Sequence, residues 1–330
     1  MFNALVLDHA GGTLTAAVRR LDRDALPEGE VLVSVLFSSI NYKDGLAVTG
    51  RGKIIRGDFP FVPGIDLVGR VEESAVDRFS EGDLVVLTGG GLGERFWGGY
   101  SQQQRVPAEY LVRLPESMTP LRAMEVGTAG FTAMLAVMAL EERGLTPEHG
   151  EVVVTGASGG VGSFAVALLA NLGYTVVASS GSEDAYAYLE RLGAARILPR
   201  DELGEGPQRP LESARWAGAV DTVGGATLAA VLSQLGRHAA VAACGNAGGH
   251  ELHTTVYPFI LRGVALLGID SNTAPYDQRC EAWKRLSWDL PKEAADLILG
   301  GVIHLDQVPA MCEEIIQGGV RGRIVVDVNA

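Results

Sequence analysis

The sequence predicts an α/β protein with two domains, an irregular β-barrel and a doubly wound parallel sheet. At 330 residues the chain exceeds the length at which one hydrophobic core usually suffices. Short apolar segments separated by turn residues fill its first third, and apolar segments alternate with helix-length segments in its middle. The 43 glycines and 20% charged residues fit a soluble protein with many tight turns between strands and helices.

The first domain is expected to be the β-barrel, over residues 1–123. Apolar segments such as EVLVSVLFS and DLVVLTG lie between turn-forming segments such as PEGE and SEGD. The chain ends in two or three helices and the strand RIVVDV, which cannot easily extend a sheet finished at residue 271. We expect this strand to rejoin the first domain, so residues 272–330 are assigned to it.

The second domain is expected over residues 124–271. Its first strand, EVVVTG, precedes the helix VGSFAVALLANLG, which Gly173 closes at the expected C-terminal cap. Further strands and helices alternate up to residue 271, which predicts a parallel sheet of about six strands. One segment, 204-GEGPQRP, is expected to be a polar loop.

Charge and cysteine content exclude several classes of protein. The net charge of -13 disfavours binding to nucleic acid or to an anionic membrane, because the field would repel phosphate. The first residues lack a cationic segment followed by a long apolar one, so we expect a cytoplasmic protein. The three cysteines show no C-x-x-C spacing, which predicts neither a disulfide framework nor a structural zinc site.

A glycine motif opens the second domain. Gly156, Gly159 and Gly162 follow the first strand and begin a helix, which is the context of a dinucleotide-binding turn. Glycine permits the tight turn, the close approach of a pyrophosphate and the packing of helix against strand. The alternative is a glycine-rich turn that binds nothing.

The end of the second strand bears on the choice of dinucleotide. An NAD site usually has an acidic residue there, whereas this chain has Ser180, Gly181 and Ser182. Small hydroxyl residues leave room for a 2′-phosphate, and Arg200 would supply positive charge. NADPH is therefore favoured over NADH; the alternative is that Asp184 bends back onto a ribose or simply lies in the first turn of its helix.

The segments 41-NYKD-44 and 64-GID-66 connect the chain to a superfamily. Over its full length the chain resembles the medium-chain dehydrogenases/reductases, whose zinc-dependent members have Cys-His-Thr-Asp and Gly-His-Glu at these places. Asn41, Tyr42 and Ile65 are poor zinc ligands, so no metal is expected. Without a Lewis acid the substrate must already be electrophilic, as an activated C=C bond or a quinone is.

Longer segments narrow the resemblance. SSINYKDGLAVTGRGKIIR, VVLTGGGLGERFWGGYS, VVVTGASGGVGS and PFILRGVALLGIDS, among others, resemble the acrylyl-CoA reductase (NADPH) family, whose members are also described as quinone oxidoreductases. The resemblance implies a GroES-like catalytic domain with a Rossmann cofactor domain. It also implies NADPH-dependent reduction of acryloyl-CoA to propanoyl-CoA in a cytoplasmic homodimer. Relatives often have Arg where this chain has Ser182.

The expected chemistry is hydride transfer to the β-carbon of the thioester and protonation of its α-carbon. Tyr42 is the first candidate to touch the nicotinamide or to donate the proton; alternatively, its ring is only a wall of the pocket. Asp44 is a second catalytic candidate, although it could instead pair with Lys43. Asp66 is expected to cap a turn.

Further residues are candidates for binding substrate and cofactor. Arg51, Lys53 and Arg56 form a basic segment that would hold the phosphates of coenzyme A, the alternative being a solvated loop. The acyl-CoA is the expected small-molecule partner. The residues expected to bind NADPH/NADP+, from the glycine motif or from the resemblance, are Tyr42, Gly156, Ser158, Gly159, Gly160, Val161, Gly162, Ser180, Gly181, Ser182, Arg200, Asn246, Ile260 and Ser271.

Two other functions remain open at this point. An NADPH:quinone oxidoreductase would use the same hydride donor and scaffold. A non-catalytic NADPH-binding sensor or interaction protein would keep the fold without the reaction.

Overall fold

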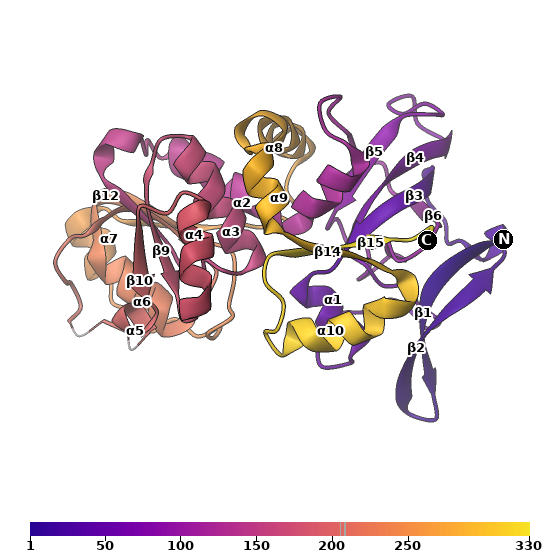
Figure 1. Cartoon of the computed structure of the whole chain (residues 1–330), viewed down its shortest axis with the longest axis horizontal. Coiled ribbons are helices and arrows are strands. Elements are labelled where there is room, and N and C mark those ends of the chain that lie inside the picture. The colour runs from indigo at the N-terminus through magenta and orange to yellow at the C-terminus, as the bar shows by residue number, and fades with distance from the viewer. Residues whose placement is uncertain (205, 208) are drawn as a thin grey trace. The chain divides into compact units, whose positions relative to one another are not determined.

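The computed structural model describes residues 1–204, 206–207 and 209–330 (Figure 1). Glu205 and Gln208, within the segment expected to be a polar loop, lie outside the described residues. The chain divides into two compact units. The first comprises Met1–Phe131, Ser271–Ser287 and Leu299–Ala330, and the second comprises Thr132–Asp270 and Trp288–Ile298.

The first unit is built on a largely antiparallel sheet of seven strands, beside a two-stranded hairpin. Six strands follow the order β14-β15-β3-β4-β5-β7, and β6 pairs with β3. The last strand of the chain pairs with β3, Val325 opposite Ser39, so it returns to the N-terminal part as expected. The strands are β1 (Phe2–Ala10), β2 (Thr13–Leu21), β3 (Val31–Ser39), β4 (Asp66–Ser74), β5 (Leu84–Thr88), β6 (Gln103–Val106), β7 (Val112–Arg113), β14 (Leu299–His304) and β15 (Arg323–Asp327).

Alternating apolar residues of these strands form the core of the first unit. Val31, Val33 and Val35 of β3 have no exposed surface and pack in one cluster with residues of β1, β4 and β5. Its helices are η1 (Arg23–Ala25), α1 (Tyr42–Val48), η4 (Leu305–Gln307), α10 (Val308–Ile316) and α8 (Tyr276–Asp289), of which α8 ends two residues into the second unit.

The second unit contains a six-stranded sheet in the order β10-β9-β8-β11-β12-β13, with every neighbouring pair parallel. The predicted doubly wound sheet is confirmed. The order of the strands changes direction between β8 and β11: the chain adds β9 and β10 on one side of β8, and then β11, β12 and β13 on the other. Ligands of such sheets bind outside the carboxyl ends of the strands at this place. The elements are β8 (Glu151–Val154), β9 (Thr175–Ser180), β10 (Arg196–Pro199), β11 (Trp216–Asp221), β12 (Leu235–Ala243), β13 (Ala265–Gly268), η2 (Pro147–His149), α3 (Gly160–Asn171), η3 (Glu183–Ala185), α4 (Tyr186–Arg191), α5 (Asp201–Gly204), α6 (Gly225–Gln234), α7 (Tyr257–Arg262) and α9 (Lys292–Ile298).

Residues 288–298 group with the second unit, although the sequence analysis assigned them to the first domain. The reason is local packing: α9 contacts α3, and the Asn171 side chain donates a 2.9 Å hydrogen bond to the Asp289 carbonyl oxygen. The first unit likewise extends to Phe131 and not to residue 123.

Helix α2 (Pro120–Glu142) is the one helix in the described part of the chain long and apolar enough to cross a membrane. Of its most apolar 18-residue window, 89% is buried inside the protein, as expected for a core helix. Gly127, with φ 49° and ψ -157°, interrupts the helix near its start.

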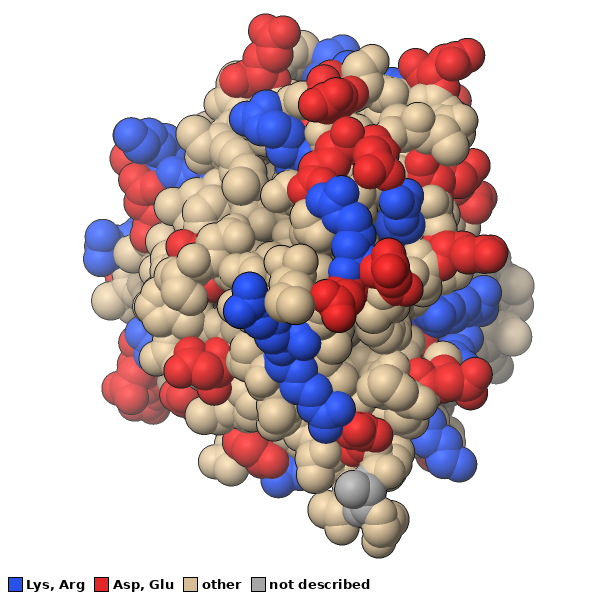
Figure 2. Space-filling view, turned by 90° about the vertical axis from the view of Figure 1, so that its right-hand side faces the viewer, with Lys and Arg blue, Asp and Glu red and all other residues tan. Residues whose placement is uncertain are grey.

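Charged side chains are mixed on the surface seen in Figure 2. Acidic groups lie around a short row of lysine and arginine side chains across the centre of this face.

Candidate active site

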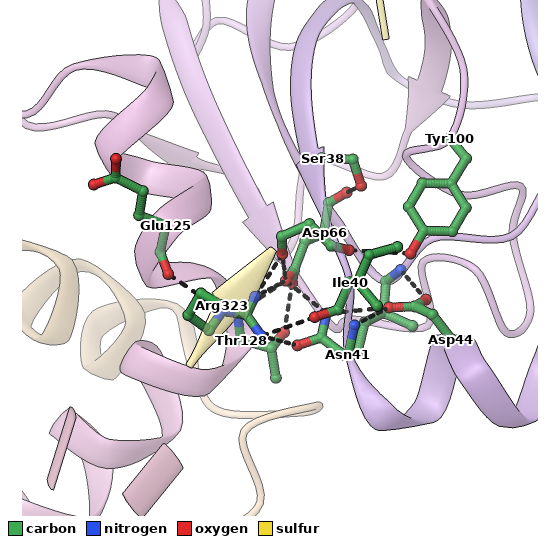
Figure 3. A network of polar contacts seen from close by, with 11 residues as sticks. Ser38, Ile40, Asn41, Asp44, Asp66, Tyr100, Glu125, Thr128 and Arg323 are labelled. Carbon is green, nitrogen blue, oxygen red and sulfur yellow. Dashed lines mark hydrogen bonds and ion pairs between the residues drawn. The ribbon is translucent and has the colours of Figure 1, made fainter. Parts of the chain in front are cut away.

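A cluster of polar side chains lies buried in the first unit, where β3 ends and β4 and β15 begin. Figure 3 shows Asp66 and Asn41 between Arg323 on one side and Tyr100 and Asp44 on the other. We call this the buried polar cluster; it comprises Ser39, Asn41, Asp44, Asp66, Tyr100, Thr128 and Arg323. Ser39, Asn41 and Thr128 donate hydrogen bonds to Asp66, and the other three residues bond to Asn41 or Ser39. The cluster is therefore one connected network.

Asp44 is placed by the start of helix α1. Asn41 is the N-cap of this helix, and Asp44, three residues on, accepts from the Asn41 backbone N–H at 2.9 Å. The same Oδ2 accepts from the Asn41 amide at 3.1 Å, and Oδ1 accepts from the Ile65 backbone N–H at 3.0 Å. A capping box therefore turns this carboxylate inward, and only 1% of it is exposed.

Asp66 is the most extensively hydrogen-bonded member. Its Oδ2 accepts from Ser39 Oγ at 2.5 Å and from Asn41 Nδ2 at 2.8 Å. Thr128 donates to it twice, through its backbone N–H to Oδ2 and its hydroxyl to Oδ1. Asp66 thus connects β3, α1 and the kink in α2; the expectation that it only caps a turn was wrong.

Arg323 opens β15 and brings a cation into the network. Its guanidinium donates to the Ile40 carbonyl oxygen, Asn41 Oδ1 and Ser39 Oγ at 2.9, 3.0 and 2.7 Å, and lies 3.6 Å from Asp66 Oδ2. Gly127 makes room for it: a Cβ there would lie 2.5 Å from Arg323 Nη2 and 2.7 Å from Asp66 Oδ2. The kink in α2 is therefore required by the close approach of these side chains.

Burial sets the protonation of the cluster. Desolvation, followed by the charge of Asp66, raises the pKa of Asp44 from 3.8 to about 7. Desolvation and the charge of Asp44 also hold the pKa of Tyr100 well above 10.0, and its hydroxyl donates to the Ser39 carbonyl oxygen at 3.1 Å. Desolvation lowers the pKa of Arg323, whereas the charges of Asp66 and Asp44 raise it in part. One guanidinium thus faces two carboxylates, of which Asp44 gains a proton near neutral pH.

The donor set of the cluster does not resemble a metal site. The described residues contain no group of three or more His, Cys, Asp or Glu arranged to hold a metal ion. The positive charge beside Asp66 is the Arg323 guanidinium, which donates hydrogen bonds to Asn41 Oδ1 and Ser39 Oγ.

Tyr42 and Lys43 precede Asp44 in α1 but form no part of the hydrogen-bonded cluster. Tyr42, the first residue of α1, is 56% exposed, so its hydroxyl is accessible to a ligand. Lys43 forms a 2.7 Å ion pair with Glu94, and the alternative of a Lys43–Asp44 pair is wrong because consecutive helical residues face different directions.

The basic segment 51–56 is exposed in the first unit. Arg51 pairs with Glu313 at 2.7 Å, both side chains being about half exposed, so part of its charge is offset. Lys53 and Arg56 are also exposed, and neither forms an ion pair with a described residue. Two free cations therefore remain for an anionic ligand.

In the second unit the glycine motif forms the predicted turn between β8 and α3. Gly156 has φ 59°, and Gly159 is the N-cap of α3 without a capping side chain. A Cβ on Gly162 would overlap the Gly156 carbonyl oxygen and lie 2.7 Å from Ala157 Cα. The backbone of Ser158, Gly159, Gly160 and Val161 therefore stays accessible for a pyrophosphate at the helix N-terminus.

The residues chosen for the 2′-phosphate also come together. Ser158 Oγ and Ser180 Oγ are 3.3 Å apart, and Ser180 Oγ accepts from the Ser182 backbone N–H at 3.2 Å. The Arg200 guanidinium lies against Gly181 so closely that a Cβ there would overlap it. Two serine hydroxyls, one after β8 and one at the end of β9, and the Arg200 guanidinium after β10 suit NADPH.

The other expected cofactor residues are more scattered. Asn246 is exposed after β12, and Ile260 is 68% exposed on α7. Ser271 is the first residue of the chain's return to the first unit, and its carbonyl oxygen accepts from Arg279. Asp184 lies in η3 with its side chain exposed.

Sequence reasoning missed most of the buried polar cluster. Thr128 and Arg323 were not considered, and Tyr100 was not connected with Asp44. The available signals were an arginine opening the apolar strand RIVVDV and a Gly-Thr pair inside an apolar helix.

Comparisons with known proteins agree with these features. The alcohol dehydrogenase GroES-like domain model matches residues 27–116, and the zinc-binding dehydrogenase model matches residues 160–288. Acrylyl-CoA reductase AcuI of Ruegeria pomeroyi is 54% identical over 100% of both chains. YhfP of Bacillus subtilis, named provisionally as a quinone oxidoreductase, is 44% identical over 99% of this chain and 98% of its own.

A solved structure of a related oxidoreductase has the same fold over almost the whole chain. The YhdH oxidoreductase of Salmonella enterica, in complex with NADP, has a TM-score of 0.96 and 52% identity, covering 99% of this chain and 100% of its own. The chain belongs to the acrylyl-CoA reductase family of the medium-chain dehydrogenases/reductases.

Proposed function

We propose that the protein reduces acryloyl-CoA to propanoyl-CoA with NADPH and without a metal. The observation that carries the proposal is the full-length identity of 54% with an acrylyl-CoA reductase. Two features of the chain support it: a dinucleotide turn suited to NADPH, and a polar cluster whose cation is a guanidinium. The thioester already polarises the C=C bond, so a Lewis acid is not required.

NADPH, when bound, would supply the hydride for the β-carbon. The residues of the second unit would bind it through the glycine turn, the two serine hydroxyls and Arg200. Arg200 and Ser180 favour a 2′-phosphate, and the Salmonella relative has NADP in its structure. The Bacillus YhfP structure holds NAD instead, so the ratio of the Kd values for NADPH and NADH should be measured for this protein.

Tyr42 is proposed to contact the nicotinamide or to donate the proton for the α-carbon, because its side chain is exposed beside the buried polar cluster. Asp44 is buried and accepts from three N–H groups, so we assign it a positioning role and not contact with the reactants. Replacing Tyr42 by Phe removes the hydroxyl and keeps the ring, so it tests proton donation without removing the ring's packing. A fall of about 10²-fold or more in kcat/KM is expected for a proton donor.

Arg51, Lys53 and Arg56 are proposed to bind the phosphates of coenzyme A. The double variant Lys53→Gln/Arg56→Gln should raise KM for acryloyl-CoA at least tenfold while kcat stays within about twofold, since each charge-assisted hydrogen bond contributes about 1.5–3 kcal/mol. Arg19→Gln/Arg20→Gln, on the exposed strand β2, is the matched control.

We further propose a cytoplasmic homodimer. β13 is an edge strand of the second unit, and exposed apolar side chains lie in it and in the segment just before it in the chain: Val256, Tyr257, Ile260, Leu261 and Leu266 are between 38% and 68% exposed. Exposed apolar side chains beside an open sheet edge favour association with a second copy.

The test is steady-state oxidation of NADPH with acryloyl-CoA and with a small benzoquinone. The proposal predicts the larger kcat/KM for acryloyl-CoA. A much larger value for the quinone would establish the second candidate, which the name of YhfP favours. NADPH binding without turnover of either substrate would instead indicate a sensor or interaction protein.

A further inference from the structure

A cavity of about 500 Å³ lies in the second unit, away from the glycine motif. It is lined by the end of α2 and the residues after it, by His149, and by the amino ends of β11 and β12. The glycine motif follows the carboxyl end of β8 in the same parallel sheet. The cavity therefore lies at the amino ends of the strands of this sheet, and the cofactor turn lies at their carboxyl ends.

The lining of the cavity is basic. It contains Arg143, Arg215 and Arg237 with His149 and His238, and none of its residues is Asp or Glu. This composition contrasts with the net charge of -13 of the chain. A cavity that gathers cations in an acidic protein is suited to an anion.

Two of the three arginines keep their charge uncompensated. Arg215 stacks on the Trp216 ring at 4.5 Å and lies 3.8 Å from Glu202, so its charge is partly offset. Arg143 makes no hydrogen bond or ion pair with its side chain to any described residue. Arg237 donates to the Leu261 carbonyl oxygen at 3.1 Å, which is a neutral acceptor.

A distortion of strand β12 carries two of the basic side chains to this place. Trp216 pairs with Leu235 but Gly218 pairs with Ala240, so β12 has three more residues than β11 between these pairs. Arg237 and His238 lie in this bulge. His238 has φ 61°, the one positive φ at a non-glycine among the described residues. Bulges and such backbone strain are typical of sites where a side chain is aimed at a ligand.

We propose that this cavity binds a nucleotide through its diphosphate group, at a site separate from the cofactor site. Guanidinium groups form paired hydrogen bonds with phosphate oxygens, and the volume is within the range of small-molecule sites. Leu140 and Leu145 provide an apolar wall for the rest of the ligand. Free ADP and the ADP portion of coenzyme A share this chemistry.

The experiment is calorimetric titration of the full chain, saturated with NADP+, with ADP, inorganic pyrophosphate and coenzyme A. ADP should bind one to one and at least tenfold more tightly than pyrophosphate. Arg143→Gln and Arg237→Gln should each raise the Kd for ADP at least tenfold. Arg191→Gln, which removes the same charge from an exposed site on α4, should change it less than twofold.

Three results would overturn the proposal: no heat with ADP, equal binding of ADP and pyrophosphate, or an equal loss of affinity in Arg191→Gln. Coenzyme A distinguishes the two sources of the ligand. Arg143-dependent binding of coenzyme A at least tenfold tighter than that of ADP identifies an acyl-CoA ligand, and weaker binding identifies a free nucleotide. Because binding is measured without turnover, the outcome is independent of the reaction proposed above.

Discussion

The buried polar cluster of the first unit and the glycine turn of the second are built in opposite ways. The cluster depends on side chains from distant segments, with Arg323 of the last strand beside Asp66 of β4. The turn depends on a continuous segment whose function needs side chains to be absent. The cluster should therefore be sensitive to loss of charge, and the turn to added volume.

The largest effect is expected from Arg323→Met. It leaves the Asp66 carboxylate buried without its cation, and breaking one side of a buried pair costs about 3–5 kcal/mol. Urea unfolding of the variant and the parent measures this loss in the free energy of unfolding.

Arg19→Met is the matched control, because Arg19 pairs with Asp8 at 3.1 Å with both side chains at least one-third exposed. Exposed pairs contribute about 0–1 kcal/mol. Equal losses in the two variants would show that Arg323 does not hold the cluster together.

The second effect concerns the turn. Gly162→Ala places a Cβ against the backbone of Gly156 and Ala157, and overpacking of this kind costs about 1–3 kcal/mol. Because the turn would move, the Kd for NADPH should rise about tenfold or more, which fluorescence titration measures.

Gly268→Ala is the control, since a Cβ there would meet no atom within 4 Å. Unchanged NADPH affinity in Gly162→Ala would contradict the assignment of the turn to the pyrophosphate.

These two regions also differ in how far the sequence predicts them. The turn was predicted residue by residue, because its glycines, the strand before them and the helix after them are neighbours in the sequence. In the cluster, only Asp44 was a catalytic candidate, with a pair to Lys43 as the alternative. Arg323 and Thr128 could not be found in the same way, since only the pairing of β15 with β3 and the kink at Gly127 bring them to Asp66. Residues 288–298 were misassigned for the same reason, as a contact with α3 decides their place.

A smaller effect is expected from Arg200→Gln. Loss of one charge-assisted hydrogen bond should weaken NADPH binding about tenfold and leave NADH binding unchanged. Titrations with both cofactors measure the ratio. An equal loss for NADH would place Arg200 outside the 2′-phosphate site.

The smallest effect is the pH dependence of stability due to Asp44. Its pKa of about 7 in the folded protein lies above its ordinary 3.8, so the folded state binds the proton more tightly. The stabilisation is complete below pH 3.8 and declines as pH rises toward 7. From pH 6 to 8 the free energy of unfolding should fall by about 1 kcal/mol from this group.

In Asp44→Asn the fall in the free energy of unfolding between pH 6 and 8 should disappear, whatever the absolute stability of the variant. In Asp8→Asn, on the exposed hairpin, the fall should remain. Urea unfolding at several pH values gives the comparison. A parent protein whose stability rises over this interval would contradict the protonation assigned to the cluster.

Conjugate reduction of a thioester by NADPH leaves a specific isotope pattern in the product, which mass spectrometry and NMR can read. With NADPH deuterated at the transferred position, we expect propanoyl-CoA with one deuterium at the β-carbon. With unlabelled NADPH in D₂O, we expect one deuterium at the α-carbon. NADPH oxidation that yields no labelled propanoyl-CoA, or cofactor deuterium at the α-carbon, would contradict conjugate reduction of the thioester.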